Sequence, residues 1–413
     1  FKIKTSSTNY RIDIYRLGYY GGDGARLISS QTVTLGSKQV QPTPLFDSST
    51  REVDAGNWAV SASWAVPSNA VSGVYFAKLT TLNGTIGQNM IPFVVTNGGA
   101  ASDITYQTAD ATWAAYNPWG GYDLYTGPDQ SSSDRAYAVS YNRPIDINST
   151  QNSAGTPDFL FGEETATIYY LEQNGYDVSY ITSGDAANTP SLLANTKVYM
   201  DSGHDEYWSQ SQYNNVQAAA NAGVNLAFLS GNQVFWDVAY ANGPSGQANT
   251  TIVEYKDPWA GAQIDPNGTS GGGSSTFRDP NFGPDLPENG LTGNIFEVNG
   301  VPQQSNVEIP YALSQFPFWQ NTGVASLQPG QVASLTNLLG YEWDTDNNNG
   351  FRPAGLVDLS STTQLVGTLM LDYGLTSGSG TATHSLTLYR NQTSGALIFS
   401  AGTMMWSWGL DTQ

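Results

Sequence analysis

The chain has 413 residues, a length that suggests two or three domains at about 150 residues per domain. Hydrophobic residues make up 39% of the chain, which is enough for packed cores and excludes a mainly disordered protein. Acidic residues outnumber basic ones by 35 to 15, giving a net charge of −20. Because phosphate-binding surfaces need clustered Lys and Arg, we expect neither nucleic acid nor membrane insertion among its interactions.

Cysteine and histidine are scarce, and this limits the chemistry. The chain contains no Cys, so disulfides, thiol nucleophiles and iron–sulfur clusters are excluded. It contains two His residues, His204 and His384, which are too few for a three-histidine zinc site within one chain. Any metal ion would therefore be held mostly by oxygen.

Residues 1–100 have the pattern of an all-β domain. Residues 10–20, 57–66, 72–82 and 91–97 alternate between apolar and polar side chains, and Asn83-Gly84 is typical of a hairpin turn. Short strands at this spacing predict an immunoglobulin-like β-sandwich. Since the chain opens on an alternating segment, we expect a first strand of the sandwich upstream of Phe1 or missing.

Residues 101–413 read as an α/β domain. Apolar strands are predicted at 103–109, 177–182, 197–203 and 224–231, and helices at 163–175 and 209–223, the latter capped by Ser209. Strands that alternate with helices predict a mostly parallel sheet. Residues from about 241 to 330 are rich in Gly, Pro, Asn and Ser, so we expect a loop-rich excursion over the sheet. The last 30 residues return to strand-like patterns, including 403–410.

Two predicted strands end in matching polar segments. His204-Asp205-Glu206 follows the strand at 197–203, and Asn232-Gln233 follows the strand at 224–231. In a parallel sheet both tips open on the same edge, where ligands bind. A charged cluster directly after an apolar strand is costly to bury without a partner, so a functional role is weighed here against a simple surface turn.

An aromatic segment follows the first predicted strand of the α/β domain. It contains Tyr116 within AYNPWGG, and Tyr125 comes nine residues later. Such clusters usually serve packing. The functional alternatives are a sugar-stacking platform and ligation of a ferric ion by phenolate oxygen.

Three further positions carry candidate chemistry. Glu342 lies between two aromatic residues, a setting that raises a carboxyl pKa toward a value useful for a general base. Asp344 and Asp346 begin a polar run similar to a calcium loop, although the glycine is one place late and no Glu closes the run. His384 begins a β-like segment, where a structural role is the more common one. No G-x-S-x-G elbow accompanies either histidine, which argues against a serine hydrolase.

Several strings together resemble the family of the N,N-dimethylformamidase large (β) subunit. They are YRIDIYRLGYYGG, GNWAVSASWAVPS, AYNPWGG, SGHDEYWS, SGNQVFW, GYEWD, NGFRPAGL and SGALIFSAGTMMWSWGLD. The resemblance covers most of the chain. It implies that residues 101–413 form a glutamine-amidotransferase-like α/β catalytic domain.

The resemblance also implies a mononuclear ferric iron, one per chain. Its ligands would be Tyr116, Tyr125 and Glu206, and the matching catalytic positions are His204, Asn232 and Glu342. Two phenolates and one carboxylate would balance three positive charges. The segment between the two tyrosines is much shorter here than in the dimethylformamidases.

The leading hypothesis is iron-dependent hydrolysis of a small amide, at a formamide-type C–N bond, by metal-activated water. One alternative is a non-catalytic extracellular surface or filament protein that keeps the fold and assembles with further copies. Another is a glycan-binding protein. Low charge, no Cys and abundant Gly, Ser, Thr and Asn fit an extracellular or cell-surface location best, and no stretch approaches the ~20 apolar residues of a membrane span.

Overall fold

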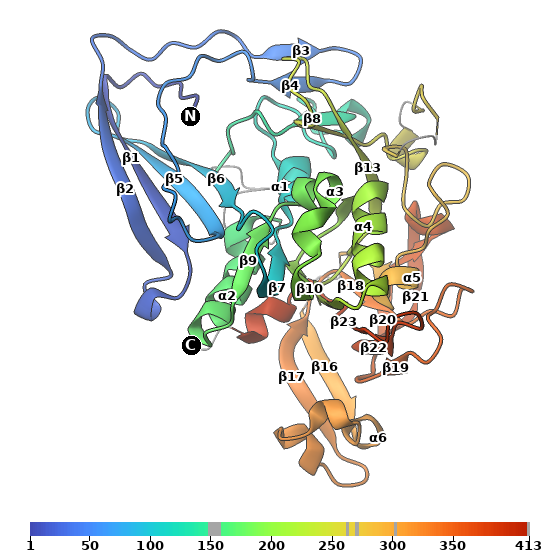
Figure 1. Cartoon of the computed structure of the whole chain (residues 1–413). Helices are drawn as coiled ribbons and strands as arrows, with labels where there is room; N and C mark the ends of the chain where they lie inside the picture. The colour runs from blue at the N-terminus through green and yellow to red at the C-terminus, as the bar shows by residue number, and fades with distance from the viewer. Residues whose placement is uncertain (148–157, 262–263, 269–271, 301–303, 411–413) are drawn as a thin grey trace.

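The computed structural model describes residues 1–147, 158–261, 264–268, 272–300 and 304–410, and it is a mixed α/β structure rich in strands (Figure 1). The described residues form six strand groups: a seven-stranded sheet, two four-stranded sheets, a small closed barrel and two hairpins. No helix in these ranges is long and apolar enough to cross a membrane.

The N-terminal sheet confirms three of the four strands predicted there. Its order is β2-β1-β5-β6 and every neighbouring pair is antiparallel, with β1 at Asn9–Leu17, β2 at Ala25–Thr34, β5 at Gly73–Thr81 and β6 at Gln88–Val95. Asn83-Gly84 lies in the connection between β5 and β6, and Gly84 takes the left-handed backbone conformation that the turn needs (φ 71°).

The strand predicted at 57–66 is wrong. This segment joins no ladder; instead its backbone bonds to the Gln41 side chain and to the carbonyl of Phe1. Its alternating side chains still face a core, since Ala62 and Trp64 pack against one side of the N-terminal sheet. The alternation therefore reports burial of one face, without strand pairing.

The immunoglobulin-like sandwich is not confirmed, because beside the small hairpin of β3 (Leu45–Asp47) and β4 (Glu52–Asp54) the described residues of this region form one four-stranded sheet. One face of that sheet is covered by the 57–66 segment together with Phe1. The other face packs on helix α2, Leu160–Gln173, through contacts such as Phe76 with Phe161. A helix and an irregular segment thus take the places where a second sheet would lie.

The seven-stranded sheet is mostly parallel, as the strand–helix alternation predicts. Its order is β19-β22-β23-β12-β10-β7-β9. The five strands from β23 to β9 run parallel, and β22 and β19 are antiparallel additions at one edge. The strands are β7 Ser102–Gln107, β9 Val178–Ile181, β10 Thr196–Gly203, β12 Asn225–Ser230, β19 Val357–Asp358, β22 Thr387–Arg390 and β23 Leu397–Ser400.

Helices cover both faces of this sheet (Figure 1). Helix α2 packs on β7 and β9, whereas α3 (Ser183–Asn188) and α4 (Gln210–Asn221) lie on the opposite face. The hydroxyl of Ser209 accepts a hydrogen bond from the Gln212 amide at 3.1 Å, which confirms the predicted helix cap. Because α4 runs antiparallel to the strands, its beginning and the ends of β10 and β12 meet at one edge.

Most of the remaining strands form three smaller groups. One mixed sheet has the order β11-β13-β14-β8, and the closed barrel has the order β15-β18-β21-β20. A hairpin of β16 and β17 projects from the body with the short helix α6 (Tyr311–Ser314) at its end (Figure 1). Their bounds are β8 Ala138–Ser140, β11 Tyr207–Ser209, β13 Trp236–Ala241, β14 Thr251–Val253, β15 Ile295–Val298, β16 Ser305–Pro310, β17 Val332–Leu339, β18 Trp343–Thr345, β20 Thr362–Leu371 and β21 Thr376–His384.

Of the strands predicted near the C-terminus, those before residue 402 are confirmed and the last one is wrong. The expected strands near 385–401 are confirmed as β22 and β23. The strand-like pattern at 403–410 is wrong, because residues Trp406–Leu410 form a 3₁₀ helix against α2. The indole of Trp408 donates to the carbonyl of Gly162 there. Residues 241–330, expected as an excursion, contribute β14, β15 and β16 to three strand groups.

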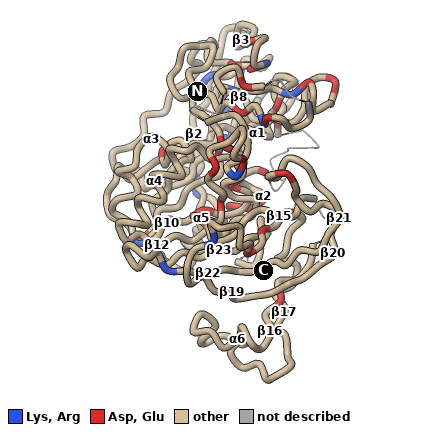
Figure 2. The backbone as a smooth tube through the Cα atoms, turned by 90° about the vertical axis from the view of Figure 1, so that its right-hand side faces the viewer, with Lys and Arg blue, Asp and Glu red and all other residues tan. Residues whose placement is uncertain are grey.

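Many of the acidic residues lie inside the molecule. Figure 2 shows Asp and Glu in the middle of the fold near α1 and α2, and relatively few Lys and Arg anywhere. Asp237 and Glu52 are buried, with 1% and 4% of their surface exposed. Burial raises the pKa of each to about 7, despite hydrogen bonds from Gln210 to Asp237 and from Thr251 to Glu52.

This burial predicts how stability depends on pH. The pKa values of Asp237 and Glu52 in the folded protein lie above the unfolded values of 3.8 and 4.5, so the folded state favours the protonated carboxyl groups. Their contribution to the stability of the fold is therefore present at low pH and is lost as pH rises toward 7. Between these limits each group lowers the free energy of unfolding by up to about 1.4 kcal/mol per pH unit. Denaturant unfolding from pH 4.5 to 7.5 should therefore show a flatter pH dependence for Asp237→Asn/Glu52→Gln than for the wild type. The same pH dependence in the double variant and the wild type would contradict this effect of the two buried carboxyl groups.

Candidate active site

Three oxygen-bearing side chains meet in the interior above the end of β10. The hydroxyl of Tyr116 lies 2.9 Å from Oε2 of Glu206, and the hydroxyl of Tyr125 donates to Oε1 of Glu206 at 2.7 Å. The two hydroxyls lie 2.9 Å apart, with the rings stacked at 4.6 Å. Glu206 is only 2% exposed. The structure thus brings together the three side chains that the family resemblance implies as metal ligands.

Local structure explains why these side chains converge. Tyr116 is the last residue of helix α1, Asp110–Tyr116, which directly follows β7. Tyr125 lies in a turn closed by Asp123, whose carboxylate accepts the amides of Tyr125 and Thr126. Glu206 follows β10 after Gly203, whose left-handed backbone (φ 82°) turns the chain at the strand end. A Cβ at Gly203 would lie 2.8 Å from that of Glu163, so glycine is required there.

A second group of polar side chains adjoins the first. His204 Nδ1 lies 2.8 Å from Asp158, and Nε2 lies 3.0 Å from Glu342 and 3.4 Å from Glu206. Asn232 donates from Nδ2 to Glu342 at 3.0 Å. Residues that follow β10 and β12 thus meet Glu342, which precedes β18.

Asn232 is held in a strained turn. Its φ is 51° and that of Val234 is 60°, values that non-glycine residues rarely adopt. The Asn232 amide donates to Asp344 at 2.8 Å, and this contact fixes the turn. Oδ1 of Asn232 is buried and has no hydrogen-bond partner in the described part of the chain. An acceptor therefore remains free beside Glu342 and His204.

A lysine and a third tyrosine, neither of them predicted from the sequence, lie beside this cluster. Lys256 is fully buried, and its Nζ lies 2.5 Å from the Tyr207 hydroxyl, which donates to Tyr125 at 2.6 Å. The ammonium also lies 3.8 Å from the centre of the Tyr125 ring and 4.1 Å from that of Trp236. A single Lys between Tyr255 and Asp257 carries no sequence pattern that marks it as buried.

Comparison with known proteins shows the family to which the chain belongs. The sequence profile described as N,N-dimethylformamidase beta subunit-like, C-terminal, matches residues 11–413. The chain belongs to the N,N-dimethylformamidase beta subunit-like family. Among curated proteins, none matches the chain significantly.

The electrostatics of the candidate site follow from burial. Removal from water, together with the nearby Glu206 charge, raises the pKa of Tyr116 and of Tyr125 well above 10. Burial also raises the pKa of Glu206. Burial alone would lower the pKa of His204, but Glu342, Asp158 and Glu206 raise it well above 6.5. A protonated imidazole therefore links the second group to Glu206.

The described residues contain no group of three or more His, Asp or Glu side chains arranged to hold a metal ion. The donor set of two phenols and one carboxylate is of a different kind. Its oxygens converge within 2.9 Å and are hard donors that suit a ferric ion. A trivalent cation would replace protons that burial otherwise retains on the phenols. The residues therefore fit the ion that the family resemblance implies.

The other sequence candidates have structural explanations. Asp344 accepts the amide of Asn232, whereas Asp346 forms a bidentate pair with Arg352. The two carboxylates thus face different partners, which argues against the calcium loop. His384 is fully buried at the end of β21, and its Nε2 lies 2.9 Å from the carbonyl of Ala401. Burial lowers its pKa to about 4, which fits a neutral structural histidine.

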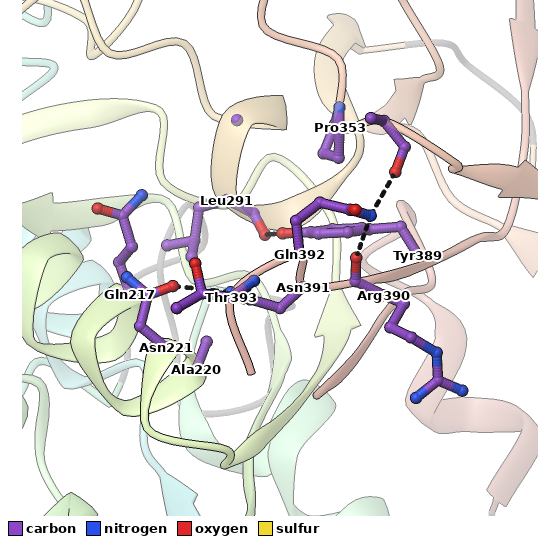
Figure 3. A pocket seen from close by; sticks show the side chains of 12 residues that line it. Gln217, Ala220, Asn221, Leu291, Pro353, Tyr389, Arg390, Asn391, Gln392 and Thr393 are labelled. Carbon is purple, nitrogen blue, oxygen red and sulfur yellow. Dashed lines mark hydrogen bonds between the residues drawn. The ribbon is translucent and has the colours of Figure 1, made fainter. Parts of the chain in front are cut away.

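A polar pocket of about 180 Å³ lies away from this cluster (Figure 3). It is lined by Gln217 and Asn221 near the end of α4, by Leu291, and by Tyr389 to Thr393 at the end of β22 and just after it. The Tyr389 hydroxyl donates to the carbonyl of Leu291 across it. Because α4 starts where β10 ends, its last turn lies toward the opposite edge of the sheet. This pocket is separate from the candidate active site.

Replacing the buried lysine tests the description of the site. Burial lowers the pKa of Lys256 to about 7 from 10.5, so the folded wild type gains stability as pH rises between these values. We expect Lys256→Met to be more stable than the wild type at pH 6, with the difference shrinking by pH 10, in denaturant unfolding.

Lys38→Met is the matched control, because Lys38 is exposed. It should leave stability unchanged at both pH values. A Lys256→Met protein less stable than the wild type at pH 6 would show that Lys256 stabilises the fold as a cation.

Proposed function

We propose that this protein hydrolyses a small amide with the help of a ferric ion held by Tyr116, Tyr125 and Glu206. The observation that carries the proposal is the convergence of these three side chains, with oxygen separations of 2.7–2.9 Å. Family membership supports an amide of the N,N-dimethylformamide type as the substrate. Two phenolates and a carboxylate carry three negative charges, so the loaded site would be electrically balanced. When bound, the ion supplies Lewis acidity toward water and a carbonyl oxygen.

Glu342 is the proposed general base and acid. Glu342 is 7% exposed, and its carboxylate is linked through His204 to the cluster of Tyr116, Tyr125 and Glu206. It would take a proton from water as the water oxygen attacks the amide carbon. After the C–N bond breaks, the same proton passes to the leaving amine, and the products are a carboxylic acid and an amine.

His204 and Asn232 position this base. The imidazole lies between Asp158 and Glu342, so it fixes the carboxylate of Glu342 relative to Glu206. Asn232 holds Glu342 through Nδ2, and its unpartnered Oδ1 is free to orient an N–H group or a water. The second N–H of the same Nδ2 would stabilise negative charge that develops on the substrate oxygen.

Iron content tests the ligand assignment. We expect about one iron per chain in the wild type and a large loss of iron in Tyr116→Phe, Tyr125→Phe and Glu206→Gln, because each removes one anionic donor. Tyr176→Phe is the control, since Tyr176 is 49% exposed. Metal analysis after reconstitution provides the measurement. Equal iron in the wild type and all three ligand variants would contradict the assignment.

Activity of Glu342→Gln tests the base. Removing a positioned general base costs about 100-fold or more in kcat, while the iron content should stay unchanged because Glu342 is not among the three ligands. Release of amine from N,N-dimethylformamide provides the readout. Full activity in Glu342→Gln would exclude Glu342 as the base, whereas a loss of iron would make it a ligand.

A further inference from the structure

A cavity of about 410 Å³ lies between the N-terminal sheet and the segment that follows β8. Strands β5 and β6 contribute Leu79, Met90 and Ile91, and the opposite wall contains Tyr141 to Pro144. The volume is within the range of about 300–1,000 Å³ typical of small-molecule sites. None of its lining residues belongs to the candidate active site.

The wall of this cavity is largely apolar and aromatic. Trp58 and Trp119 meet edge to face, with ring centres 5.8 Å apart and planes at 82°, and form one corner. Ile3, Ala55 and Pro144 contribute further apolar surface. A flat ring or a short alkyl chain is the kind of group that such a wall accommodates.

The charge of the lining is opposite to that of the protein. Three basic residues, Lys2, Lys4 and Arg143, line the cavity, and no acidic residue does so in the part of the chain that the structure describes. The whole chain has 35 acidic and 15 basic residues, so a random lining would contain more acids than bases. The cavity therefore favours an anion in a protein that otherwise repels anions.

The donors of the lining divide into occupied and free groups. Arg143 donates to backbone carbonyls of Ala114, Trp119, Tyr122 and Ser140, so four of its five N–H groups are occupied and it contributes mainly charge. The Nδ2 group of Asn142 is buried and has no partner among the described residues. A buried donor without an acceptor costs about 1–3 kcal/mol, and an acceptor on a ligand would remove that cost. Lys4 is exposed, with its ammonium 5.9 Å from the Trp58 ring.

We propose that this cavity binds a small amphipathic anion, a carboxylate carried on an apolar ring or short alkyl body. The apolar body packs between Trp58, Trp119 and the β6 side chains. The carboxylate accepts from Nδ2 of Asn142 and faces the positive charge of Lys4 and Arg143. The site is independent of the proposed iron chemistry, so a failed test of one proposal leaves the other unaffected.

Calorimetric titration with 2-naphthoate tests the proposal, with 2-naphthylmethanol and 2-naphthylmethylammonium as neutral and cationic analogues. We expect saturable binding in the order anion, neutral, cation. Asn142→Leu should weaken binding of the anion about tenfold or more, because a hydrogen bond to a charged group is lost. Ala55→Leu should abolish binding by filling the cavity.

Charge variants keep the test independent of folding. Lys4→Glu lies at an exposed position and should weaken the anion about fivefold, whereas Lys38→Glu carries the same charge change elsewhere and should have no effect. Melting temperatures identify any variant that fails to fold. The proposal is overturned if the wild type binds none of the three probes saturably. It is also overturned if the cation binds as well as the anion, or if Lys4→Glu and Lys38→Glu behave alike.

Discussion

The structure depends on holding acidic oxygens out of water where few cations are present to balance them. Glu206, Tyr116 and Tyr125 share hydrogen bonds in a space where burial favours their protonated forms. Two cationic groups flank the cluster, since Lys256 reaches it through Tyr207 and His204 reaches it directly. Such a cluster costs free energy to assemble. A bound trivalent cation would offset that cost by its attraction to the clustered oxygens, and this is the physical reason for the proposed iron chemistry.

The fold supplies this cluster through one edge of the parallel sheet. β10 ends at Gly203 and β12 ends at Ser230, and the polar residues that follow each strand point into the same space. Helix α1 delivers Tyr116 from the neighbouring β7, and β18 delivers Glu342 from the barrel. This convergence requires a strained turn at Asn232 and a glycine at position 203.

Sequence patterns predict the parts of this structure that rest on local periodicity. The parallel strands, the capped helix α4 and the shared edge of the two polar segments follow from apolar runs, caps and strand–helix alternation. The alternation of apolar and polar side chains wrongly predicts a strand at 57–66, because a half-buried irregular segment can show the same period of two residues as a strand. Pairing of His204 with Asp158 and the burial of Lys256 depend on contacts between residues 46 or more positions apart, and no local pattern specifies them.

Resonance Raman spectroscopy of the iron-loaded protein, excited in its visible absorption band, tests the proposed donor set most directly. If Tyr116 and Tyr125 are both ligands, the spectrum will contain tyrosinate ring modes that weaken but persist in Tyr116→Phe and in Tyr125→Phe, and that vanish when both are replaced. Iron-loaded wild-type protein without tyrosinate modes would contradict the account, because the metal would then be bound by other residues.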